Sequence, residues 1–337
     1  MPVSSTPNDL SRRDFMRVWT GSAASDQGKS AVADAGMITY DTPVLTPNDR
    51  FYRMPCLSPQ VPILDRQSWS LTVDGLVRQP LALSYADLRD RPAVGQMRTL
   101  ISMGNPPGGD QIGNAVWRGC LLEDLLTEVQ VQPSATHLRF ETADGYHTSV
   151  PLEHILTNDV LLAYEMNGAL LSPAQGHPLR VLVPGLYDLK SPGWVTRLTL
   201  LDHEDRGYWE RDPHNWSNTA VIKTQSKIIM PLTQQELLCG AAVAMQGVAF
   251  AGLKAITGVQ VSINRGGWMP AALRSPDSDH AWTQWYALWS PQLPGDYEIT
   301  VRATDETGYR QEVWPSLQSD AFPAGSSTMH SLTVSVV

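Results

Sequence analysis

The sequence predicts an α+β domain followed by an all-β sandwich. Between residues 41 and 217, short segments with period-two apolar alternation are mixed with segments whose apolar residues have helical spacing. From residue 218 onward the segments alternate, and turn residues separate them at intervals typical of a sandwich. A length of 337 residues also agrees with two domains. We therefore expect domains at 41–217 and 218–337, preceded by a tail at 1–40.

The first half contains a strand signal, two helix signals and several further apolar segments. Residues 69–75 alternate and end in Asp-Gly, which is typical of a strand running into a turn. Ser84 is a favourable N-cap for a short helix to Leu88, and residues 121–129 carry apolar residues at helical spacing. Three more segments predict strands that we expect in one mixed sheet: 137–142, 160–164 and 180–184.

The second half contains alternating segments with turn signals between them. Asn264 to Gly267 and Pro294-Gly295 are such turns, and no helix longer than a turn or two is indicated. The tryptophans of this half are what a sandwich core or a dimer interface needs, so we assign them to packing and not to chemistry. Four segments predict strands: 259–263, 282–287, 296–302 and 329–337.

Composition excludes several classes of protein. Hydrophobic residues make up 42% of the chain and charged residues 18%, which excludes wholesale disorder. The net charge of −9 makes nucleic acid an unfavourable main partner. Three widely separated cysteines at 56, 120 and 239 form no zinc or iron–sulfur motif. No run of 18 apolar residues occurs, so we expect no integral membrane segment.

The N-terminal tail contains an arginine pair in a suggestive context. Residues 11–17 read SRRDFMR, which resembles a twin-arginine export signal. Such a signal also needs an apolar stretch, but residues 18–36 contain several polar and charged side chains. Two interpretations stay open: an export signal, which places the protein in the periplasm, or a tail with a chance arginine pair, which leaves it in the cytoplasm.

A series of short motifs runs through the chain in a fixed order. It continues from about residue 42 to the C-terminus, and it includes TPNDRFYR at 46–53 and PLRVLVPG at 178–185. In this order the motifs resemble the sulfite-oxidase-like molybdopterin oxidoreductases. The other matching segments of the first half are 69–75, 99–119, 144–146, 161–168 and 190–194. In the second half, residues 258–268, 282–289 and 302–311 resemble the dimerisation domain of that family.

The resemblance implies a fold, a cofactor and partners. The fold is a mixed α/β molybdopterin domain followed by an immunoglobulin-like dimerisation domain. The cofactor is molybdenum-molybdopterin, and the activity is oxygen-atom transfer on a small-molecule substrate, either an oxo-anion or an S- or N-oxide. The implied partners are a second copy of the chain and an external electron carrier such as a c-type cytochrome.

The resemblance also assigns residues to the cofactor. Arg180 takes the place of a cofactor-binding arginine, and a guanidinium suits a phosphate. Lys190, Ser191 and Gly193 occupy the phosphate-holding loop, where they supply charge, a hydroxyl and close backbone approach. The simpler alternative makes Arg180 and Lys190 solvated surface charges. The remaining assignments are Phe51, Tyr52, Arg53, Asp144 and Gln175, the last standing where relatives carry histidine or asparagine.

The position of the molybdenum ligand departs from the family pattern. The family uses a cysteine three residues before the asparagine that corresponds to Asn105, and this sequence has Ser102 there. We assign Ser102 as the metal ligand and, with Asn105, as the catalytic pair. An oxygen donor changes the redox properties of the metal, so altered oxygen-atom transfer is expected. Replacement of the missing thiolate by Cys56 or Cys120 is disfavoured, because free cysteines usually pack as small core residues.

Two other functions stay open beside the oxidoreductase. The missing cysteine also fits a catalytically impaired descendant that binds the cofactor or serves as a structural dimer. A further hypothesis is a metal site in the polar stretch before the second domain. Polar stretches of this kind are usually solvated linkers between domains. That site would use His203, Glu204, Asp205 and His214.

Overall fold

The structure is a computed structural model that describes residues 44–53, 57, 60–314 and 321–337. All of them belong to one compact unit, Tyr40–Val337. The twin-arginine-like motif and Cys56 lie outside the described residues. No helix in the described part is long and apolar enough to cross a membrane.

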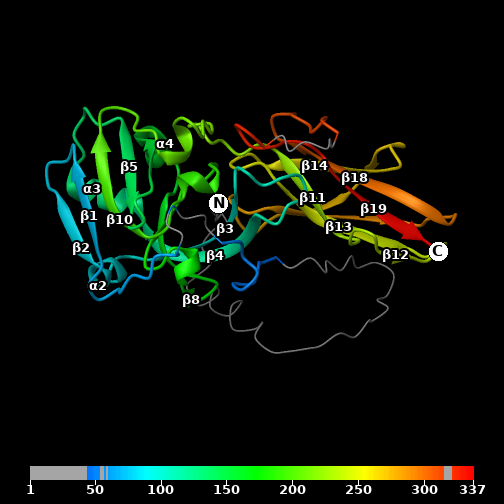
Figure 1. Cartoon of the computed structure of the whole chain (residues 1–337), viewed down its shortest axis with the longest axis horizontal. Coiled ribbons are helices and arrows are strands. Elements are labelled where there is room, and N and C mark those ends of the chain that lie inside the picture. Colours follow the sequence, from blue (N-terminus) through cyan, green and yellow to red (C-terminus); the bar gives the residue numbers. More distant parts are fainter. Residues whose placement is uncertain (1–43, 54–56, 58–59, 315–320) are drawn as a thin grey trace, which may run out of the picture. The chain divides into compact units, whose positions relative to one another are not determined.

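The first sheet brings together strands from both ends of the N-terminal half. At its centre β1 runs parallel to β10, with Val73 opposite Leu198, and the other neighbours are antiparallel. Leu71 and Val73 alternate with more exposed residues along β1, as period-two patterning requires. Figure 1 shows β1, β10 and β5 side by side. The order is β2 (Leu81–Ser84), β1 (Ser70–Gly75), β10 (Val195–Leu201), β5 (His137–Thr142) and β6 (His147–Pro151).

A second sheet carries the strand on which Arg180 lies. The expectation that 137–142, 160–164 and 180–184 share one sheet is wrong, because the first of them pairs in the first sheet and the other two pair here. Alternation identifies strands but carries no information on their partners. The order is β3 (Val94–Ile101), β4 (Ile112–Leu121), β7 (Leu161–Met166) and β8 (Ala169–Leu170), with β9 (Arg180–Leu182) beside β7.

Three short α-helices in the described residues pack against this half, and two of them confirm the sequence signals. Ser84 caps α2 (Tyr85–Arg89) by accepting a hydrogen bond from the Asp87 N–H at 3.2 Å. Helix α3 (Leu122–Val129) buries one apolar face, and α4 (Leu152–Thr157) follows β6. Single 3₁₀ turns complete the half: η1 (Pro173–Gln175), η2 (Asp188–Lys190) and η3 (Tyr208–Glu210).

The C-terminal half is a β-sandwich, as predicted. Trp285 from one sheet and Val261, Ile299 and Val334 from the other meet in a single core. One sheet has the order β11 (Gln225–Met230), β13 (Val243–Phe250), β17 (Thr283–Trp289) and β16 (Ala272–Arg274). The other has the order β12 (Glu236–Leu237), β19 (His330–Val336), β18 (Gly295–Asp305), β14 (Ile256–Ile263) and β15 (Met269–Pro270).

The sandwich supports the loop that follows β3. The Thr99 N–H donates to the His280 carbonyl at 2.9 Å, and the Thr99 hydroxyl accepts from the Trp282 N–H at 2.8 Å. Lys227 on β11 donates to the Gly109 carbonyl at 2.9 Å. The segment from 99 to 109, which includes Ser102, is therefore held at both ends by the second half of the chain.

Candidate functional site

Arg180 is a completely buried cation with an N–H group left over. It lies on strand β9, and its guanidinium carbon is 5.5 Å from the centre of the Trp117 ring. Its Nε donates to the Ser191 carbonyl at 3.2 Å and its Nη1 donates to Gln175 Oε1 at 3.3 Å. Its Nη2 has no hydrogen-bond partner among the described residues. Burial lowers the pKa of Arg180 from its ordinary value, which is the cost of holding a charge away from water.

Gln175 ties Arg180 to the segment at 51–53. Its amide nitrogen donates to the carbonyls of Tyr52 at 3.0 Å and Phe51 at 3.4 Å. The Phe51 ring is buried and meets Trp117 edge-on, with 5.6 Å between ring centres, so it contributes packing. Arg53 is exposed. Of the three residues predicted in this segment, Tyr52 is the one that reaches the buried polar cluster.

Asp188 is a buried carboxyl group beside Arg180 and Tyr52. It is 5% exposed, and neither its Oδ2 nor the Tyr52 hydroxyl makes a hydrogen bond of ordinary geometry among the described residues, although the two groups interact with each other and with Arg180. Burial raises the pKa of Asp188 to about 6, although Arg180 and the backbone N–H of Met103 both favour its ionised form. Burial and the neighbouring Asp188 also raise the pKa of Tyr52 well above its ordinary value.

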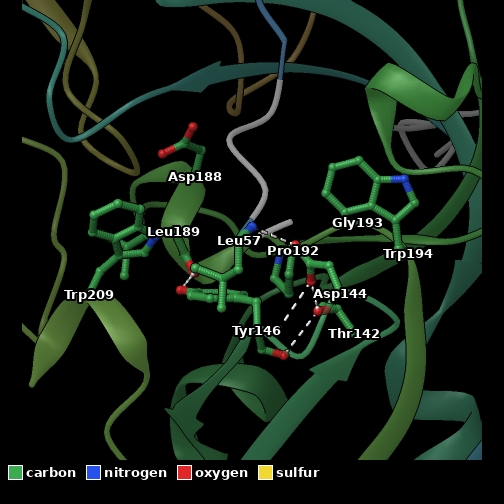
Figure 2. A pocket seen from close by; sticks show the side chains of 10 residues that line it. All are labelled: Leu57, Thr142, Asp144, Tyr146, Asp188, Leu189, Pro192, Gly193, Trp194 and Trp209. Atoms are coloured by element: carbon green, nitrogen blue, oxygen red, sulfur yellow. Dashed lines mark hydrogen bonds between the residues drawn. The ribbon is translucent and has the colours of Figure 1, made fainter. Parts of the chain in front are cut away.

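A small cavity of about 30 Å³, open to solvent, lies next to this cluster. Its two charged side chains among the described residues are both acidic, Asp144 and Asp188. The oxygens of Asp144 are occupied, since they accept from the Leu57 N–H at 2.7 Å, the Tyr146 N–H at 3.2 Å and the Thr142 hydroxyl. Figure 2 shows Asp188 at one end of the cavity, with its carboxyl group directed away from Asp144. The lining is Leu57, Thr142, Asp144, Tyr146, Asp188, Leu189, Pro192, Gly193, Trp194 and Trp209.

Lys190 points into the protein and is neutralised there. Its ammonium group contacts the Glu210 carboxylate and donates to the Thr148 hydroxyl at 3.0 Å and the Ser149 carbonyl at 2.8 Å. The side chains of Lys190 and Glu210 are 3% and 1% exposed. Arg180 is equally buried, so the alternative that both cations are solvated surface charges is wrong. The charge of Lys190 is neutralised by an internal ion pair. The Arg180 guanidinium, in contrast, keeps one N–H group that makes no hydrogen bond of ordinary geometry among the described residues.

Ser191 and Gly193 serve the backbone around the cavity. The Ser191 hydroxyl accepts from the Val183 N–H at 2.9 Å, which joins the loop to β9. Gly193 lines the cavity, and its Cα would lie 2.6 Å from a Cβ added at Gly176, whose φ is +96°. Glycine is therefore required at position 176, where these two loops cross.

Ser102 and Asn105 shape the loop after β3. The Asn105 N–H donates to the Ser102 carbonyl at 3.0 Å, and the Ser102 N–H donates to the Gln111 carbonyl at 2.9 Å. The Asn105 side-chain oxygen accepts from the Gln111 N–H at 2.9 Å and closes the loop. Ser102 is half-buried and does not line the cavity, but the next residue, Met103, lies against Asp188. The loop and the polar cluster are therefore neighbours.

The four residues of the alternative metal site do not converge. Asp205 pairs with Arg139 at 3.0 Å, Glu204 pairs with Arg206 at 3.3 Å, and the His214 ring packs on Tyr208. In the part of the chain that the structure describes, no group of three or more His, Cys, Asp or Glu side chains is placed to hold a metal ion.

Cys120 is also unsuited to metal binding. It is fully buried in the apolar core of the N-terminal half, and burial raises the pKa of its thiol to about 11. A thiol that stays protonated is a poor ligand. The structure therefore agrees with the assignment of Cys120 to packing.

Sequence reasoning missed Asp188, the buried carboxyl group that interacts with Arg180 and Tyr52. Its sequence context, a lone Asp between apolar residues, resembles many surface turns. Glu210, the partner of Lys190, was missed for the same reason. The signal that separates both from surface acids is their burial, and burial follows from tertiary packing.

Comparisons with known proteins agree with this arrangement. Residues 58–209 match the family described as oxidoreductase molybdopterin binding domain. The chain is 30% identical to Arabidopsis thaliana sulfite oxidase over 279 residues, covering 68% of this chain and 70% of that protein. It is 28% identical to the mitochondrial sulfite oxidase of Drosophila melanogaster, covering 77% of this chain and 54% of the fly protein, about half its length. The crystal structure of the sulfane dehydrogenase SoxCD from Paracoccus pantotrophus superimposes with a TM-score of 0.68 at 25% identity, covering 86% of this chain and 88% of that one.

Proposed function

Because the chain belongs to the sulfite-oxidase-like molybdenum-dependent oxidoreductases, whose cofactor is molybdopterin, we propose that it transfers an oxygen atom to or from a small neutral S- or N-oxide. The observation that carries this proposal is a cluster of three buried polar atoms, Arg180 Nη2, Tyr52 Oη and Asp188 Oδ2, which interact with one another but make no hydrogen bond of ordinary geometry among the described residues. Such groups cost stability unless a ligand satisfies them. A polar, phosphate-bearing cofactor fits this requirement.

Different residues of the chain would make different contacts with the cofactor. Arg180 supplies the buried positive charge and a free N–H for an anionic group, and Gln175 fixes its orientation. Tyr52 offers a hydroxyl, and Gly193 lets the backbone approach closely. Lys190 acts indirectly, because its ion pair with Glu210 holds the loop in place.

The bound molybdenum supplies the oxygen-atom transfer. In the reducing direction, the substrate loses an oxygen atom as water and takes up two electrons and two protons, with the electrons coming from an external carrier. A c-type cytochrome is the carrier that we propose. The acidic side chains Asp144 and Asp188 favour a neutral substrate over an oxo-anion, because the described lining of the cavity contains no cation to balance an anionic charge.

We also propose roles for the sandwich and for the N-terminal arginine pair. We propose that the sandwich is an immunoglobulin-like dimerisation domain, and that the arginine pair at 12–13 directs export to the periplasm. The first follows from the family resemblance and the second from the twin-arginine-like motif.

The test of the proposed function is cofactor content. The full chain, produced in a molybdenum-replete host, should contain about one molybdenum and one pterin per protein molecule, measured by elemental analysis and by fluorescence of the oxidised pterin. Arg180→Gln should lower the pterin content at least about tenfold. The matched control is Arg98→Gln, since Arg98 is equally buried but donates to Gln96 and to the Leu182 carbonyl.

Two results would remove parts of the proposal. Wild-type protein without molybdenum and pterin would leave the structural-dimer alternative. Loaded protein that turns over sulfite or nitrate more efficiently than dimethyl sulfoxide or trimethylamine N-oxide would overturn the neutral substrate class.

A further inference from the structure

The sandwich places a histidine ring against the loop at 102–111, which follows β3. His330 is the first residue of β19, and a Cβ added at Gly108 would lie 2.2 Å from both Cδ2 and Nε2 of the His330 ring. Gly108 also has a φ of +72°, so its backbone conformation and this close contact both require glycine. None of the proposed contacts with the cofactor uses His330.

The His330 ring is fixed in place by a hydrogen bond at Nδ1. This nitrogen accepts from the Ile228 backbone N–H on β11 at 3.0 Å, so it carries no proton and the ring is neutral. Burial and the nearby Lys227 act in the same direction, because they lower the pKa of His330 to about 4. A neutral and anchored ring is a fixed surface against which the loop packs.

Contacts inside the loop connect Gly108 to Ser102. A Cβ added at Gly109 would lie 2.5 Å from Asn105 Oδ1, so the Asn105 side chain packs directly against the residue after Gly108. Asn105 donates its N–H to the Ser102 carbonyl at 3.0 Å, and its Oδ1 accepts from the Gln111 N–H at 2.9 Å. A displacement of Gly108 therefore changes the place of Ser102, because every step of this path is a close contact or a hydrogen bond.

The same loop contacts the buried polar cluster of the N-terminal half. The Met103 backbone N–H faces the Asp188 carboxyl group, and Asp188 interacts with Arg180. The loop also carries the two residues to which the family resemblance assigns catalysis. It therefore has one contact with the sandwich, through His330, and another with the cluster that the proposed cofactor would satisfy.

We propose that His330 is a positioning residue, which sets the place of the loop at 102–111 relative to the buried cluster by packing against Gly108. The sandwich then takes part in the site, in addition to its proposed role in dimerisation. The inference rests on the proposed function, since the place of the loop affects turnover only if the cofactor binds. The place of the loop itself does not depend on the cofactor, so it is measured separately on cofactor-free protein.

The first test measures amide hydrogen exchange at 102–111 in the cofactor-free full chain. His330→Asn keeps an oxygen that can accept from the Ile228 N–H but removes the ring from Gly108, so exchange in the loop should become at least about tenfold faster. Gly108→Ala should have the same effect, because the added methyl group collides with the ring. Exchange in β10 should stay at the wild-type rate in both variants, which shows that the rest of the fold is intact.

A control variant and a double variant separate the ring contact from backbone strain. Gly240 has a φ of +74°, but an added Cβ there would meet no described atom within 4 Å, so Gly240→Ala should leave exchange at 102–111 unchanged. The effect of Gly108→Ala should be at least about threefold smaller when it is added to His330→Asn than in the wild type. Equal effects in the two backgrounds would overturn the inference.

The second test uses protein loaded with cofactor. In His330→Asn the pterin content should stay within about twofold of the wild type, while kcat falls at least about tenfold and KM changes by less than about twofold, for whichever of the four substrates named above the wild type turns over best. Wild-type exchange at 102–111 in His330→Asn, or unchanged kcat despite faster exchange, would overturn the inference. Wild-type protein that lacks pterin altogether would instead overturn the proposed function, so the two failures are distinguishable.

Discussion

Two buried aspartates, one in each half of the molecule, differ in the hydrogen bonding and in the pKa of their carboxyl groups. Asp305 in the sandwich is 1% exposed and accepts from Thr224 and Lys254, each at 2.6 Å, and from the Thr307 N–H at 3.0 Å. Burial opposes ionisation of Asp305, but hydrogen bonds from these residues outweigh it and hold its pKa well below the usual range. Asp188 in the N-terminal half is similarly buried, yet it keeps an unpartnered oxygen and a raised pKa.

The two carboxyl groups differ in how well the fold satisfies them. A satisfied buried carboxylate stabilises the fold that surrounds it, whereas an unsatisfied one costs stability and persists where a ligand needs it. Asp305 follows the first pattern and Asp188 follows the second. Arg180, with its unused Nη2, belongs with Asp188 in this respect.

The largest expected effect is on stability when Asp305 is changed. Asp305→Asn leaves Lys254 without its counter-charge and weakens the hydrogen bonds to Thr224 and Thr307. The free energy of unfolding should fall by about 3 kcal/mol. Urea unfolding of the full chain measures it. A loss below about 1 kcal/mol would show that Asp305 is not the structural member of the pair.

The second effect is a pH dependence of stability that should distinguish Asp188. Because its pKa is raised to about 6, the unfolded chain releases this proton at lower pH than the folded chain does, so Asp188 costs the folded state stability as pH rises from about 4 to about 6. Between pH 4 and pH 7, cofactor-free Asp188→Asn should therefore gain about 2–3 kcal/mol in free energy of unfolding relative to the wild type.

The measurement for Asp188 is urea unfolding at several pH values, on protein from a host that makes no cofactor. Asp305 should act with the opposite sign, since its lowered pKa gives stability that is present above pH 4 and lost as pH falls below it. Parallel pH profiles for wild type and Asp188→Asn would contradict the contrast between the two aspartates.

The smallest effect is expected for the unsatisfied hydroxyl of Tyr52. Tyr52→Phe removes a buried hydroxyl that makes no hydrogen bond of ordinary geometry among the described residues, so the free energy of unfolding should change by less than about 1 kcal/mol while pterin content falls. The matched control is Tyr146→Phe, because the Tyr146 hydroxyl donates to the Leu189 carbonyl at 2.7 Å and its loss should cost about 1–2 kcal/mol. Equal stability losses in the two variants would mean that the Tyr52 hydroxyl has a structural partner.

Local signals predicted the elements well and their partners poorly. Ser84 marks the start of α2, and the leucines of 121–129 mark α3, because caps and apolar spacing act over a few residues. The strand predicted at 180–184 ends at Leu182, two residues before Pro184, which lacks an N–H to donate. The pairing of β1 with β10 and of β7 with β9 depends on contacts far apart in the sequence, and alternation does not encode them.

The sequence by itself determined the family and the division into a mixed half and a sandwich, since these follow from motif order and periodicity. Only the tertiary structure decided how each charge is used. It turned Lys190 toward Glu210, left Arg180 with a free donor, and brought Asp188 to the loop of Ser102. The physical reason is that the cost of burying a charge depends on which groups from distant segments surround it.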